Sequence, residues 1–326
     1  MTLQTEQAGR RLRSALGFVL LAGFAPAQVE RAYVPNENSG TVTIIDVQSD
    51  TVAATVPVDG ERPRGLAVTP DSRFLYTANA NTNNVSVIDL RTRKVTAKIF
   101  IGHAPELAIL SPDGKRLYVT NETGEIAQLS VIDTTTNKVI SAIQVGQETE
   151  GLAFSPDGKL LYAANEAENT ISIVNLAKNV VQASIPLEGI GVRPRGITVA
   201  PDGRRIYASL ESSGHLVVID AASHKLIGKL AMGLRPYGLA LTRDGGRIYV
   251  ANGRSHDVRV VDTGALRVIA QIPVGKRPWG VALTRDGRKL YAANGESHSV
   301  SVIDTTRDQV IKTVSVGEKP WGVIIR

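Results

Sequence analysis

The chain has 326 residues, of which 43% are hydrophobic and 21% are charged, and it contains no cysteine. This composition is typical of globular proteins and excludes disordered and collagen-like chains. The absence of cysteine excludes disulfides, thiolate metal sites, iron–sulfur clusters and covalently attached c-type haem. The formal charge of +6 falls to +4, with 34 basic and 30 acidic residues, when the first 27 residues are set aside, so the remainder is only mildly basic.

The amino-terminal segment has the pattern of a secretory signal peptide. Arg10, Arg11 and Arg13 precede an apolar run over residues 15–25, and small residues follow up to Ala27. Basic, apolar and small-residue regions in this order are typical of a cleaved signal. The apolar run is about half of the ~20 residues that a membrane-spanning helix needs. We therefore expect a signal peptide over residues 1–27, a mature domain over residues 28–326, and a periplasmic or secreted protein without a membrane span.

The rest of the sequence is one unit repeated seven times. A tyrosine recurs every 42 to 45 residues, at Tyr33, Tyr76, Tyr118, Tyr162, Tyr207, Tyr249 and Tyr291. Asparagine follows three residues later in six of the seven repeats, and Leu210 stands at that position in the other. A β-branched pair ending in Asp or Asn follows each tyrosine. A second element, most often Pro-x-Gly, recurs at Pro63, Pro105, Thr149, Pro194, Pro236, Pro278 and Pro320. The first six of these lie 13 residues before the next tyrosine, which indicates a rigid strand–turn–strand unit.

Each repeat is expected to form four short antiparallel strands. In the second repeat these are residues 65–68, 74–77, 85–88 and 95–99, and turns such as Pro112-Asp113-Gly114 in the third repeat are typical of hairpins. Every segment is broken by Gly, Pro or Asn before a helix of ~10 residues forms, which excludes helical repeats. The sequence therefore predicts an all-β, seven-bladed β-propeller.

The two ends of the repeat array complement each other. Tyr33 has no proline element ahead of it, whereas Pro320 is followed by an unpaired strand sequence over residues 321–325. We predict that this C-terminal strand is the inner strand of the blade built from residues 31–58, which closes the ring and removes a pair of exposed strand edges. The recurring Asn and Asp residues are predicted to accept backbone hydrogen bonds in Asx turns.

Tyr118-Val119-Thr120-Asn121, with Ser111-Pro112-Asp113-Gly114 before it and Val131-Ile132-Asp133 after it, resembles the repeats of the YVTN family of β-propellers. Within that family, a secreted single-domain chain of this size is most similar to the β-propeller proteins associated with pyrroloquinoline quinone (PQQ)-dependent catabolism. This resemblance implies an accessory or binding role in periplasmic alcohol oxidation, with a PQQ-dependent dehydrogenase or a transport component as a partner. It supplies no catalytic residues.

The loops that lead into the inner strands differ most from repeat to repeat and are predicted to surround the mouth of the central channel. Five of the seven are basic, and three consecutive ones carry an aromatic residue directly after the proline. Guanidinium groups bind carboxylates and aromatic faces stack on flat rings, so this arc favours a flat anion such as PQQ. The candidate ligand-binding residues are Arg62, Arg64, Arg193, Arg195, Arg235, Tyr237, Lys276, Arg277, Trp279, Lys319 and Trp321.

The two remaining loops, which are adjacent in the ring, form an acidic gap that contains His103, Glu106, Glu148 and Glu150. The three carboxylates are weak candidates for a Ca²⁺ site or for acid–base chemistry, as in propeller lactonases. His256 and His298 occupy equivalent positions in adjacent blades, about 9 Å apart by sevenfold geometry, whereas two ligands of one zinc lie within ~4 Å. A shared zinc is therefore disfavoured.

The function expected from the sequence is that of a monomeric, non-catalytic binding protein that requires no cofactor. No GxSxG, HExxH or phosphate-cradling loop is present. Single-stranded nucleic acid also combines flat rings with negative charge, but a charge of +4 disfavours it. The sequence is also compatible with a protein-interaction scaffold and with a lactonase-like hydrolase.

Overall fold

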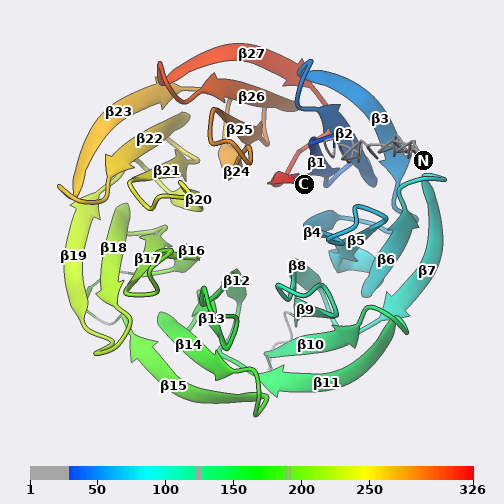
Figure 1. The fold of residues 1–326 in the computed structure, drawn as a ribbon, viewed down its shortest axis with the longest axis horizontal. Coiled ribbons are helices and arrows are strands. Elements are labelled where there is room, and N and C mark those ends of the chain that lie inside the picture. The colour runs from blue at the N-terminus through cyan, green and yellow to red at the C-terminus, as the bar shows by residue number, and fades with distance from the viewer. Residues whose placement is uncertain (1–28, 122–126, 188, 191) are drawn as a thin grey trace, which may run out of the picture.

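The computed structural model describes residues 29–121, 127–187, 189–190 and 192–326. It consists of seven four-stranded antiparallel sheets arranged as the blades of a ring (Figure 1). The predicted all-β, seven-bladed propeller is confirmed. No helix in the described part of the chain is long and apolar enough to span a bilayer. The predicted signal peptide over residues 1–27 lies outside the described residues.

Each blade runs from an inner strand at the channel to an outer strand at the rim (Figure 1). One short 3-10 helix, η1 (Ala80–Thr82), follows β5. Blade by blade, from the inner to the outer strand, the elements are β28 (Ile324–Ile325), β1 (Arg31–Asn36), β2 (Thr41–Asp46) and β3 (Thr51–Pro57); β4 (Pro63–Val68), β5 (Phe74–Asn79), β6 (Asn84–Asp89) and β7 (Lys94–Phe100); β8 (Pro105–Leu110), β9 (Arg116–Asn121), β10 (Gln128–Asp133) and β11 (Lys138–Gln144); β12 (Thr149–Phe154), β13 (Leu160–Asn165), β14 (Thr170–Asn175) and β15 (Val180–Pro186); β16 (Pro194–Val199), β17 (Arg205–Leu210), β18 (His215–Asp220) and β19 (Leu226–Ala231); β20 (Pro236–Leu241), β21 (Arg247–Asn252), β22 (Asp257–Asp262) and β23 (Arg267–Pro273); and β24 (Pro278–Leu283), β25 (Lys289–Asn294), β26 (Ser299–Asp304) and β27 (Gln309–Ser315).

The two middle strands of each blade form the core. Their residues are buried almost without interruption, as in β13 and β25, because neighbouring blades cover both faces of the sheet. The repeat tyrosines are buried between blades. The outer strands alternate between exposed and buried residues, as in β15 and β23, since only one of their faces is covered.

The recurring polar residues play two different roles. The Asp that ends the third strand accepts backbone hydrogen bonds from the following turn, as Asp89 does from the Thr92 N–H at 2.8 Å, which confirms the prediction. The Asx-turn prediction is wrong for the Asn after each tyrosine. Asn165 instead donates its amide to Thr170 and Ser172 at 2.9 and 2.8 Å, because the paired strand places two hydroxyl groups within reach of that amide.

The inner strands approach one another closely at their glycines. A Cβ on Gly238 would lie 2.7 Å from the carbonyl oxygen of Trp279, and one on Gly280 would lie 2.8 Å from the Cα of Gly322. A larger residue at either position would push the neighbouring inner strand outward. These glycines therefore set the width of the channel.

The ring closes as predicted, with β28 on the inner edge of β1 (Figure 1). Tyr33 pairs with Ile324, and the N–H of Trp321 donates to the carbonyl of Pro35 at 3.1 Å. On the outer side, the Tyr291 hydroxyl and the Lys289 ammonium both bind Asp50 across the same junction. Burial, together with the hydrogen bond to Asp50, raises the pKa of Tyr291.

Candidate functional site: the channel mouth

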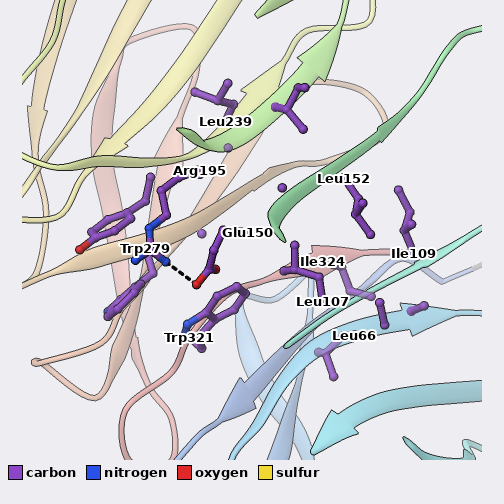
Figure 2. Close-up of a pocket in the computed structure, with 18 of the residues that line it drawn as sticks. Leu66, Leu107, Ile109, Glu150, Leu152, Arg195, Leu239, Trp279, Trp321 and Ile324 are labelled. Carbon is purple, nitrogen blue, oxygen red and sulfur yellow. Dashed lines mark ion pairs between the residues drawn. The ribbon is translucent and has the colours of Figure 1, made fainter. Parts of the chain in front are cut away.

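The channel contains a cavity of about 450 Å³ (Figure 2). Its wall is mainly aliphatic and is contributed by the inner strands of all seven blades. Polar side chains gather at one end of the cavity, where Figure 2 shows Glu150, Arg195, Trp279 and Trp321 close together. The aliphatic wall includes Leu66, Leu107, Ile109, Leu152, Leu239 and Ile324.

The side chains that line this end of the cavity, Glu150, Arg195, Tyr237, Trp279 and Trp321, all stand at one position of the repeat, directly after the proline element or, for Glu150, after the Thr149 that replaces the proline. We call the seven side chains at this position the mouth ring; in order around the propeller they are Trp321, Arg64, Glu106, Glu150, Arg195, Tyr237 and Trp279. The structure thus brings together five of the predicted ligand-binding residues with two carboxylates of the predicted acidic gap.

The aromatic half of the mouth ring is a continuous stack. The rings of Tyr237 and Trp279 are stacked with centroids 4.7 Å apart, and those of Trp279 and Trp321 are 6.1 Å apart. A guanidinium lies against each end of the stack, with Arg195 5.3 Å from Tyr237 and Arg64 5.5 Å from Trp321. Much of the aromatic surface that the sequence offered to a ligand is therefore in contact with neighbouring side chains.

The other half of the mouth ring is held by buried ion pairs. Arg64 pairs with Glu106 of the next blade, and Arg195 pairs with Glu150 at 2.8 Å. Both arginines also reach carboxylates behind the ring. Arg64 binds Glu37, and Arg195 binds both Glu166 and Glu211, at 2.6 and 2.8 Å. The acidic side chains are almost fully buried, so each depends on its guanidinium partners.

The outer basic residues are paired as well. Glu37 also binds Arg62 and Lys319, each at 2.8 Å, and Glu211 also binds Arg235 at 3.2 Å. Arg193 contacts Glu166 and Glu211, and Arg277 binds Glu296 at 3.1 Å and lies over Trp279 at 4.6 Å. Lys276 is exposed. Because buried carboxylates compensate most of the predicted cationic arc, its attraction for a polyanion is weaker than the sequence indicates.

The pKa values of two of these carboxylates reflect this compensation. Burial alone would raise the pKa of Glu37, but the charges and hydrogen bonds of Arg64, Lys319 and Arg62 lower it to about 2. Burial is likewise outweighed at Glu211, where Arg195 holds the pKa below its ordinary value. Both groups therefore stay ionised at neutral pH, which does not suit a general acid or base near pH 7.

The histidines near the mouth have a structural role. The residue before each proline element has a positive φ. In the blades of Ala104, Arg193, Arg277 and Lys319, the N–H of this residue donates to a side chain of the preceding blade. His256 Nδ1 accepts this bond from Arg277 at 3.0 Å and His298 Nδ1 accepts it from Lys319 at 2.9 Å, as the Asn169 side chain does from Arg193.

The three carboxylates of the predicted acidic gap do not share one environment. Glu106 and Glu150 are buried in ion pairs, whereas Glu148 and His103 are exposed. Within the described residues, no group of three or more His, Asp or Glu side chains is arranged to hold a metal ion.

Sequence reasoning missed the residue four positions after each repeat tyrosine. Glutamate stands there in three described blades, at Glu37, Glu166 and Glu211, and supplies the buried counter-charges. Glycine stands there where the ring residue is Tyr237 or Trp279, because a Cβ on Gly295 would lie 2.5 Å from Trp279 Nε1. Aligning the seven repeats and comparing the residue at this position with the mouth-ring residue would have revealed that glutamates here accompany arginines in the ring.

Replacing Gly295 with alanine should therefore displace Trp279 from its stack. We expect a loss of about 1–3 kcal/mol in the free energy of unfolding, as for overpacked cores, together with a red shift of the tryptophan emission. Gly264→Ala is the matched control, since its Cβ would meet only Asp262 at an ordinary 3.4 Å. Equal effects of the two substitutions on melting and emission would contradict this account.

The fold and the channel define a seven-bladed β-propeller with its candidate site at one mouth of the axis. A family model described as "Lactonase, 7-bladed beta-propeller" matches residues 101–232 and 152–263, which together span half of the chain. A second model, for YNCE-like β-propellers, matches residues 33–157. The chain belongs to the lactonase family of seven-bladed β-propellers.

Solved structures have the same fold. Hydrazine synthase of Kuenenia stuttgartiensis is 26% identical with a TM-score of 0.76, over 84% of this chain and 92% of that one. The periplasmic gluconolactonase of Pseudomonas aeruginosa is 20% identical with a TM-score of 0.74, and the match covers 91% of this chain and 99% of that one. A protein of unknown function from Desulfotomaculum acetoxidans is 17% identical with a TM-score of 0.79, and the match covers 90% of this chain and 98% of that one. The last two show the fold alone.

Proposed function

We propose that the protein is a non-catalytic binding protein that takes a small, flat, mainly apolar organic molecule into the channel. The observation that carries this proposal is the cavity of about 450 Å³, whose wall is mainly aliphatic, with polar side chains gathered at the mouth ring and Arg326 as a further charged residue of the lining. Small-molecule sites typically have this size and this division between an apolar wall and a few placed polar groups.

The wall and the mouth ring would bind different parts of such a ligand. Leu107, Ile109 and Leu152 line one side of the cavity, and the edges of Trp279 and Trp321 line another (Figure 2). An apolar ring between them gains burial on both faces, at roughly 25 cal/mol per Å² removed from water. The polar edge of the ligand would face Arg195 and Glu150.

Binding can be tested with 2-methylnaphthalene as the probe. The chain contains two tryptophans, and both line the cavity, so [¹⁵N]tryptophan labelling gives indole N–H signals that report on this site. Ile109→Gln places an amide in the apolar wall and should weaken binding about tenfold, or ~1.4 kcal/mol. Ile140→Gln is the matched control on β11 of the same blade, where the side chain is 52% exposed.

Two results would overturn the proposal. Indole signals that stay unchanged at saturating probe would show that the cavity binds no apolar ring. Equal affinities of the Ile109→Gln and Ile140→Gln variants would place the probe outside the channel.

A carboxylated ring such as PQQ is a second candidate ligand, at the outer side of the mouth. A cavity of about 230 Å³ lies there between the last blade and the first, lined by Arg277, Trp279, His298 and Lys319 among others. The guanidinium over the indole face favours a flat anion at this place. Titration with PQQ in the same indole experiment tests it, and binding would support a periplasmic accessory role beside a PQQ-dependent dehydrogenase or a transport component.

Lactone hydrolysis is favoured by the family and by the relative described as a gluconolactonase. A sugar lactone needs partners for its hydroxyl groups, which the aliphatic wall does not supply. The rate of δ-gluconolactone hydrolysis with and without the protein decides between the two functions.

A further inference from the structure

We infer that the polar end of the channel ligand is a protonated amine and that Glu150 receives it. This inference rests on the proposed binding function and adds the chemical class of the head group. It follows from the one junction of the mouth ring where neighbouring side chains carry the same charge.

Six of the seven junctions in the mouth ring join complementary groups. They are two aromatic stacks, two contacts between a guanidinium and an aromatic ring, and two ion pairs. The seventh junction places Glu106 on β8 beside Glu150 on β12, at equivalent positions of adjacent blades. Because both side chains at this junction carry negative charge, it favours a cation over an anion.

Glu150 has the unused hydrogen-bonding capacity. Its side chain is 6% exposed, and Oε1 binds Arg195 at 2.8 Å, but Oε2 has no hydrogen-bond partner among the described residues. Figure 2 shows its carboxylate at the polar end of the cavity, between Arg195 and Trp321. A buried carboxylate oxygen without a donor costs free energy, which a ligand N–H would recover.

An anionic head group would gain less at this position. The charge of Arg195 is already shared among three buried carboxylates, so a further carboxylate would meet Glu150 without an unshared cation. An ammonium would bind Glu150 and donate to the Oε2 that has no hydrogen-bond partner. The aliphatic wall then holds the apolar body of the amine.

Three probes with one apolar body separate the head groups: 2-naphthylmethylamine, 2-methylnaphthalene and 2-naphthoate at pH 7. We expect the amine to bind at least tenfold more tightly than 2-naphthoate, with 2-methylnaphthalene between them. Glu150→Gln should weaken the amine at least fivefold and leave 2-methylnaphthalene unchanged, which also shows that the cavity is intact. Glu296→Gln is the control, because Glu296 is an exposed carboxylate that pairs with Arg277.

The outcomes separate this inference from the proposed function. If 2-naphthoate binds as tightly as the amine, or if Glu150→Gln leaves the amine unaffected, the inference is overturned while channel binding stands. If the Glu150→Gln variant does not fold, the relative affinities of the three probes for the unmodified protein still show whether the channel prefers an amine. If none of the three binds, the proposed function fails and the inference fails with it.

Discussion

A chain lacking residues 318–326 is expected to lose its cooperative melting transition and to aggregate. The deletion removes β28 and the hydrogen bonds that Arg326, Trp321 and Lys319 make with the first blade. It also uncovers the inner edge of β1 and removes Val323, which is buried in the core between the last and first blades. An unpaired edge of this kind is a template for association with other chains.

Circular dichroism melting and light scattering on the truncated and full-length proteins would measure this effect. Ile311→Gln on β27 is the control, since this side chain is 48% exposed at the rim. Unchanged melting of the truncated protein would show that the ring does not depend on β28 for closure.

Replacing Arg195 with methionine should cost about 3–5 kcal/mol in the free energy of unfolding at pH 7. Methionine keeps much of the side-chain volume but removes the guanidinium on which Glu150, Glu166 and Glu211 converge. Buried carboxylates that lose their partner are destabilising by this amount. Arg73→Met is the matched control, because the Arg73 guanidinium also stacks on an aromatic ring, Phe74, but is exposed; we expect a change within about 0.5 kcal/mol.

The destabilisation caused by Arg195→Met should depend on pH in the opposite direction to the contribution of Glu37. Glu37 has its pKa lowered to about 2, so its contribution to stability is present above its ordinary value of 4.5 and is lost as the pH falls toward 2. In the variant, burial of Glu211 is opposed by fewer charges, so its pKa should rise. Protonation of Glu211 then relieves its repulsion with the neighbouring buried carboxylates. The difference in the free energy of unfolding between the variant and the unmodified protein should therefore shrink as the pH falls from 7 to 5. A constant difference in urea unfolding over this range would contradict the role assigned to Arg195.

The sequence was sufficient to predict the fold because each element of the repeat has a local physical cause. The spacing of the tyrosines, the hairpin turns and the incomplete repeats at the two ends predict the blades and their closure, and the structure confirms them. The candidate site was predicted only in part. The arginines were recognised, but Glu166 and Glu211 lie 16 residues or more from the arginine that they bind, and a pattern read along one loop does not show which carboxylate lies behind it.

The ring closure has a consequence for how the chain folds. Contacts within a blade join residues close in sequence, and most contacts between blades join neighbouring repeats, so blades can form in succession along the chain. The junction of β28 with β1 is different, because Tyr33 and Ile324 are separated by almost the whole chain. Bringing such distant segments together costs loop-closure entropy and slows folding. A ligand that bridges the first and last blades would hold this junction closed and would therefore slow unfolding.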